Sequence, residues 1–245
     1  ILSMHPEIEG IFDGPQSFSI QGDGHSSGFG EAHHIWRGLN NRRYDVRKGE
    51  GTLWGLPSIV SELYVSSVSN RKKRQLINEL IDARKTNKIP LIKWSHNVLR
   101  IPLIKELFPN AKFVFVTRDY KSYIESCMHK WNMDINLGNL SSESHIDYPH
   151  IGLHWLLINT IALYDLRKYA NDDYIHIKLH DVHGAKPIRT GTIDQVFKFL
   201  MLGPIEIDDS IFDNPFIYKR SQNEADIDII SEIVDGLIDY ERSLM

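Results

Sequence analysis

Short apolar runs rich in β-branched and aromatic residues alternate with helical patterns along the middle of the chain. The clearest run is Ala111–Arg118 (AKFVFVTR), which follows the turn-favouring pair Pro109-Asn110, and two others are Ile89–Trp94 and Asp173–Leu179. Strands that alternate with helices usually form a parallel sheet that is covered on both faces. The sequence therefore predicts an α/β fold with three layers, in which helices cover both faces of a parallel central sheet.

The segments between these runs carry helical patterns. A helix is expected over Ser69–Lys85, and another over Asn97–Phe108 (NVLRIPLIKELF), with Pro102 in its first turns. The segment His150–Tyr169 is apolar on most sides, so we expect a buried helix there. A last helix is expected over Asp226–Leu244. In the helix expected over Ser69–Lys85, the apolar face comprises Leu76, Ile77, Leu80 and Ile81.

One helix start is indicated by a capping signal. Thr192 and Gln195 have the spacing of a capping box, in which a hydroxyl and an amide satisfy backbone groups at the first turn. We therefore expect the helix TIDQVFKFLML to begin at Thr192.

Composition excludes some classes of partner and compartment. The 245 residues are 42% hydrophobic, which suits one sizeable core, and we expect a single domain over residues 1–245. The net charge of −4 argues against nucleic acid, although a compact anion needs only a local positive pocket. Cys127 is the single cysteine, which fits a reducing compartment such as the cytoplasm. The most apolar stretch, Leu153–Leu163, is too short to span a bilayer.

Polar residues follow two of the predicted strands where each strand ends. Lys93, Ser95 and His96 come at the end of one strand, and Arg118 ends the next. In open parallel sheets, ligands bind beyond the carboxyl ends of the strands. We therefore expect these side chains to lie at a ligand site.

Arg118 is followed at once by a predicted helix that begins at about Asp119. Ser122 and Ser126 lie on one face of that helix, four residues apart. An arginine, serine hydroxyls and a helix N-terminus together make a phosphate site. The alternative is that Arg118 pairs with Asp119 or with a carboxylate at the sheet edge, and that the serines are ordinary surface residues.

The segment KWSHNVLRIPLIKELFPNAKFVFVTRDYKSYIES resembles the central part of bacterial-type sulfotransferases that use 3′-phosphoadenosine 5′-phosphosulfate (PAPS). In that family a lysine ends one strand, FP-A-FV introduces the next, and RD opens the following helix. Downstream, His154, Trp155 and Asn159 and the run YIHIKLHDVHGAKP...FKFL resemble later family elements. The resemblance covers about Lys93–Leu202 and implies the P-loop-NTPase-like sulfotransferase fold.

The resemblance also implies roles for individual residues. Arg118 and Ser126 match the family pair that binds the 3′-phosphate of the donor, and we add Ser122 and Arg220 to the donor-binding set. Lys93 matches a residue that stabilises negative charge on the transferring sulfonate. The acceptor would be a small molecule, lipid or carbohydrate that carries a hydroxyl or amine.

Three residues compete for the role of general base. Asp23 and His25, in IQGDGH, match acceptor-cleft positions of the family motif SIGGESH. His96 lies three residues after Lys93, one residue further than in the best-known cytosolic members. The alternatives are a glycine-rich loop over Ser17–His34 whose polar groups face water, and an imidazole bonded to backbone at a helix N-terminus.

One family element is not visible in the sequence. It is the Gly-, Ser- and Thr-rich loop between the first strand and first helix, which cradles the 5′-phosphosulfate. We expect it either upstream of Ile1, which makes ILSMHPEIEGIF the following helix, or missing near Phe12 and Asp13, which makes EIEGIF the preceding strand. A genuine loss would leave an inactive enzyme.

Two rival functions use the same fold. A nucleotide kinase would need a Walker lysine and Mg²⁺ ligands, and the sequence shows neither. A non-catalytic binding protein would account for the missing loop.

The chain has 12 histidines, but the pair His150 and His154 lacks the glutamate of a zinc-protease helix, so we expect no metal site.

Overall fold

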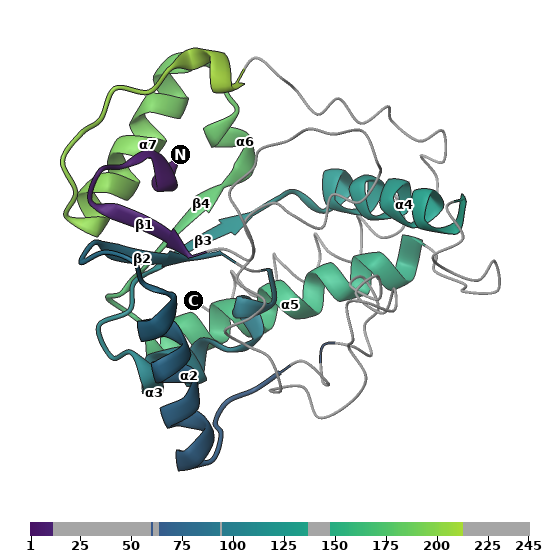
Figure 1. Ribbon diagram of the computed structural model, residues 1–245. Coiled ribbons are helices and arrows are strands. Elements are labelled where there is room, and N and C mark those ends of the chain that lie inside the picture. The colour runs from purple at the N-terminus through teal and green to yellow at the C-terminus, as the bar shows by residue number, and fades with distance from the viewer. Residues whose placement is uncertain (12–59, 61–63, 94, 137–147, 213–245) are drawn as a thin grey trace.

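The computed structural model describes residues 1–11, 60, 64–93, 95–136 and 148–212 (Figure 1). Its strands are β1 (Ile8–Ile11), β2 (Ile89–Ile92), β3 (Phe113–Thr117) and β4 (Tyr174–Lys178). Its α-helices are α2 (Asn70–Ala83), α3 (Ile101–Leu107), α4 (Tyr120–Asn136), α5 (Tyr148–Tyr169), α6 (Leu179–Val182) and α7 (Lys186–Leu200). Short 3₁₀ helices are η1 (Leu2–Met4), η5 (Ser95–Leu99) and η6 (Asp209–Phe212).

The strands pair in parallel, as the alternation of strands and helices predicted. In β1 and β2, Ile8 lies opposite Ile89 and Ile11 opposite Ile92. In β3 and β4, Phe113 lies opposite Tyr174 and Thr117 opposite Lys178. Among the described residues these pairs form two two-stranded sheets instead of one continuous sheet. Because the strands of a pair run in the same direction, their carboxyl ends share one edge.

Helices cover the strands on two sides, which gives the predicted three layers. In Figure 1, α7 lies on one side of the strands, and α2, α3 and α5 lie on the other. Ile8 packs against α7, whereas Ile11 of the same strand packs against α2 and α3. The two residues are an odd number of positions apart, so a strand directs them to opposite faces. On β3, Phe115 packs against α5.

The strand β1 decides between the two expectations for the N-terminal segment. Residues Ile8–Ile11 form a strand, so the expectation that ILSMHPEIEGIF is a helix is wrong. His5 ends the short helix η1, and its Nε2 lies 3.0 Å from the carbonyl oxygen of Gly203. The last predicted helix, over Asp226–Leu244, lies outside the described residues.

Helix α2 agrees with its predicted span but exposes one residue of its predicted apolar face. Ser69 caps the helix by accepting a hydrogen bond from the backbone of Lys72. Leu76 and Leu80 are buried against the sheet and α3, whereas Ile81 is 58% exposed. One position beyond Leu80 lies about 100° further around the helix, so Ile81 points away from the core.

The single helix predicted from Asn97 is two elements, η5 and α3. Arg100, which lies between them, has φ −135° and ψ 13° and caps α3. Pro102 is in the first turn of α3. A proline ring clashes with the carbonyl group four residues earlier, which here belongs to Val98, so one α-helix cannot run through both elements.

The capping-box prediction at Thr192 is wrong. Helix α7 begins at Lys186, with Ala185 as its N-cap and Pro187 in its first turn, where proline is favoured. The Thr192 hydroxyl donates to the carbonyl oxygen of Ile188 at 2.9 Å, as hydroxyls inside helices do.

The prediction that α5 is buried on most sides also needs correction, because Tyr164 is 60% exposed and Leu153 is exposed as well. Among the helices that the structure describes, none has the length and apolar character needed to cross a lipid bilayer.

Candidate active site

The carboxyl ends of three strands carry cationic residues. Lys93 follows β2 and is exposed, and Arg118 follows β3 and is half-buried. Lys178 ends β4 and lies opposite Thr117, one residue before Arg118. Sequence reasoning did not single out Lys178, because its place beside the end of β3 depends on the register of the strand pair. Arg118 and Lys178 thus provide positive charge at the β3–β4 edge.

Asp119 caps the helix that follows Arg118. Its carboxylate accepts a hydrogen bond from the backbone N–H of Ser122 at 2.9 Å, and its carbonyl accepts from Tyr123 at 3.0 Å. The helix α4 therefore begins where the sequence predicted. Ser122 and Ser126 are both half-buried on α4, one turn apart. Arg118 thus lies two residues before the helix that bears both serines.

Two contacts hold the backbone on either side of this junction. The indole N–H of Trp155, on α5, donates to the carbonyl oxygen of Arg118 at 3.0 Å. The hydroxyl of Thr117 lies 2.7 Å from Nε2 of His176, on β4. Partial desolvation, and then the charge of Lys178, lower the pKa of His176.

A buried histidine on α5 joins this helix to α4. Nδ1 of His154 lies 2.9 Å from the hydroxyl of Tyr123, and the two rings are stacked, with centroids 6.1 Å apart. The His154 side chain is fully buried, and desolvation lowers its pKa to about 4. The imidazole is therefore neutral, and it fixes the two helices to each other.

This burial predicts a loss of stability in mild acid. The ordinary pKa of 6.5 holds in the unfolded chain and about 4 in the folded one, so below pH 6.5 only the unfolded chain takes up this proton. The free energy of unfolding should fall by about 3 kcal/mol as the pH falls from about 6.5 to about 4. Urea denaturation between pH 7 and pH 4 measures the slope.

The matched variants for this measurement lie on the same helix. His154→Gln removes the group and should give a flatter pH dependence than the wild type. His150→Gln removes an exposed imidazole one turn earlier and should keep the wild-type slope. Equal slopes for His154→Gln and the wild type would contradict the assignment.

A family model described as the sulfotransferase family matches residues 31–200. The chain belongs to the sulfotransferase family. Comparisons with curated proteins and with solved structures give no match. Membership assigns the chain to enzymes that transfer a sulfate group, and it confirms the resemblance that was based on the strand ends and the RD helix start.

The sulfotransferase match and the described residues cover the same part of the predicted site. Lys93, His96, Arg118, Ser122 and Ser126 lie both within the match and among the described residues. His96 is half-buried in η5, directly after the Lys93 strand end. The other three predicted residues, Asp23, His25 and Arg220, lie outside the described residues and outside the match.

Where the sulfotransferase chain is described, it shows no group of three or more metal-ligating side chains. His180 has a carboxylate partner of its own, because its Nε2 lies 3.0 Å from Oδ1 of Asp181. The described part of the chain thus provides no ligand set for a metal.

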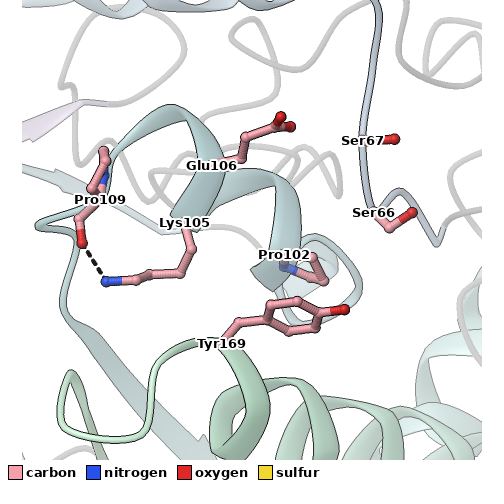
Figure 2. Close-up of a pocket in the computed structure, with 7 residues that line it drawn as sticks. All are labelled: Ser66, Ser67, Pro102, Lys105, Glu106, Pro109 and Tyr169. Atoms are coloured by element: carbon pink, nitrogen blue, oxygen red, sulfur yellow. Dashed lines mark hydrogen bonds between the residues drawn. The ribbon is translucent and has the colours of Figure 1, made fainter.

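The sulfotransferase also has a shallow pocket that lies away from these strand ends. Its lining residues come from α3 and the turn after it, the end of α5 and the segment before α2: Ser66, Ser67, Pro102, Lys105, Glu106, Pro109 and Tyr169. In Figure 2, the Lys105 ammonium reaches the Pro109 carbonyl, and Lys105 also pairs with Asp173 at 2.8 Å. Asp173 directly precedes β4, so this pocket lies at the amino end of that strand. Ligands of parallel sheets bind at the other end, so we do not assign the reaction to this pocket.

Proposed function

We propose that this sulfotransferase uses PAPS as donor and transfers its sulfonate to the hydroxyl or amine of a small-molecule, lipid or carbohydrate acceptor. The observation that carries the proposal is the junction of β3 and α4. There an arginine at a strand end is followed at once by a capped helix that bears two serines. Such a junction suits a phosphate monoester, because a guanidinium fork and hydroxyl groups match its oxygens.

Each side chain has a defined task in the proposed reaction. Arg118 and Ser126 bind the 3′-phosphate, and Ser122 and Arg220 complete the donor site. The acceptor oxygen or nitrogen attacks sulfur while the bond from sulfur to the bridging phosphate oxygen breaks. The leaving group is 3′-phosphoadenosine 5′-phosphate.

Two further tasks concern charge and the acceptor proton. Lys93 stabilises the negative charge that grows on the sulfonate and on the bridging oxygen. The acceptor proton passes to Asp23, His25 or His96. Positioning and fixed charge supply most of the rate enhancement. We place the reaction in one domain that spans residues 1–245 and in the cytoplasm, which suits a chain with a single cysteine.

The donor site is tested by Arg118→Ala. The variant should bind 3′-phosphoadenosine 5′-phosphate more weakly by about 1.5–3 kcal/mol, the usual value of hydrogen bonds to a charged group. Isothermal titration calorimetry with the full-length protein measures the dissociation constant. Arg74→Ala, which removes an exposed arginine near the start of α2, is the control and should bind like the wild type.

The same titration decides the choice of donor. The wild type should bind 3′-phosphorylated adenosine nucleotide much more tightly than adenosine 5′-phosphate. Equal affinity for the two nucleotides would overturn the proposed function.

A further inference from the structure

The backbone of Arg118 lies just beyond the regular pairing of its strand. Thr117 and Lys178 are the last pair of the β3–β4 ladder, and α4 begins only at Tyr120. Arg118 therefore connects a strand and a helix, outside the hydrogen-bond pattern of the strand ladder. A long side chain that must meet a phosphate in a bidentate geometry needs its backbone fixed to a fraction of an ångström.

We infer that Trp155 and the Thr117–His176 pair are positioning residues that fix this connection, so that Arg118 can recognise the 3′-phosphate of the donor. The inference rests on the proposed function. It assigns no donor contact to Trp155 or His176, and it concerns the selectivity of the site for the 3′-phosphate.

Trp155 holds the carbonyl side of Arg118. Its indole N–H donates to that carbonyl at 3.0 Å, and the indole is itself held on α5. The Tyr120 ring meets it edge-on, with centroids 6.1 Å apart, and the buried residues Ile124 and Ile151 pack in the same cluster. The side-chain amide of Asn159 donates to the Trp155 carbonyl at 2.7 Å. Because packing fixes the indole, its N–H is a directional anchor for the Arg118 backbone.

Thr117 holds the amino side of Arg118. Its hydroxyl lies 2.7 Å from Nε2 of His176, which belongs to the neighbouring strand. The His176 ring packs against the Phe115 ring, with centroids 5.1 Å apart, and Phe115 is buried in the core against α5. This contact adds a side-chain attachment at Thr117, the last residue of the β3–β4 ladder and the neighbour of Arg118. The two anchors come from different elements, so they fix the connection from both sides.

The test removes the hydrogen-bonding group of each anchor in turn. Trp155→Phe keeps an aromatic ring but removes the N–H, and Thr117→Val keeps the shape but removes the hydroxyl. Thr117→Ser keeps the hydroxyl and serves as the conservative variant. For each full-length variant, calorimetry gives the dissociation constants of 3′-phosphoadenosine 5′-phosphate and of adenosine 5′-phosphate. The constant for adenosine 5′-phosphate divided by that for the 3′-phosphorylated nucleotide measures recognition of the 3′-phosphate.

We expect Trp155→Phe and Thr117→Val each to lower this ratio about three- to tenfold, the effect of one lost hydrogen bond, with little change for adenosine 5′-phosphate. Thr117→Ser should stay close to the wild type. Combined with Arg118→Ala, neither change should lower the ratio further, because residues that act through one group are not additive.

The possible failures are distinguishable. A wild type that does not favour the 3′-phosphorylated nucleotide overturns both the proposed function and this inference. A wild type whose preference is lost in Arg118→Ala, but kept in Trp155→Phe and Thr117→Val, overturns the inference alone. Equal weakening of both nucleotides also overturns it, since that result would show a general structural role.

Discussion

Asp23→Asn is expected to lower turnover on the order of 10²-fold or more, the usual scale of general-base catalysis, while leaving donor affinity unchanged. Asparagine keeps the shape of aspartate but cannot take a proton from the acceptor. Steady-state sulfotransfer assays with a panel of hydroxyl and amine acceptors, followed by mass spectrometry, measure the change. His25→Asn tests whether the neighbouring imidazole orients Asp23.

The pH profile separates the candidates for the base. A histidine base gives activity that rises through roughly pH 6–7, whereas an ionised aspartate gives no such limb unless burial raises its pKa. His96→Asn is the matched variant for the β2 strand end. Near-normal turnover in Asp23→Asn together with a large loss in His96→Asn would assign the base to His96 and leave the glycine-rich segment a lesser role.

Lys93→Ala is expected to lower turnover on the order of 10²-fold, with a much smaller effect on donor affinity. The sulfonate gains negative charge mainly in the transition state, so a cation beside it contributes there more than in the bound ground state. Lys88→Ala is the matched control, because Lys88 is an exposed lysine directly before the same strand, at its opposite end. That control should keep wild-type turnover.

A different pattern in the kinetic constants would change the role of Lys93. If Lys93→Ala raised KM alone and kept kcat, the lysine would bind the donor equally in the ground state and the transition state. The charge-stabilising role would then be wrong, although the donor site at Arg118 would be unaffected.

The strands and the start of α4 could be predicted because their signals are local. The run before Arg118 is β-branched and aromatic, and β3 occupies most of it. Asp119 follows the strand directly, and it is the cap of α4. Thr192 shows the limit of such signals, because a capping-box spacing also occurs inside a helix, where Pro187 sets the start earlier.

The part of the site that sequence reasoning missed depends on contacts between distant residues. The partner of the Arg118 carbonyl is 37 residues away in sequence, and the partner of the Thr117 hydroxyl is 59 residues away. The sequence identified Trp155 only as part of a family-like run, with no indication of what its N–H would contact. Likewise, nothing local shows that Lys178 ends level with Thr117, since register comes from the packing of the whole strand pair.

The parallel pairing of both sheets also determines the order in which this protein can assemble. Ile8 pairs with Ile89 across an intervening segment that contains α2. Phe113 pairs with Tyr174 across a segment that contains α4 and α5. Bringing the ends of such long segments together costs conformational entropy before any contact between the strands forms. We therefore expect folding to be slow compared with that of a helical bundle of equal size. During synthesis, β1 leaves the ribosome long before β2 exists, so it lacks this partner strand in that interval. The junction that carries Arg118 gains its contact with His176 of β4 later still, so this strand–helix connection is completed at a late stage of synthesis.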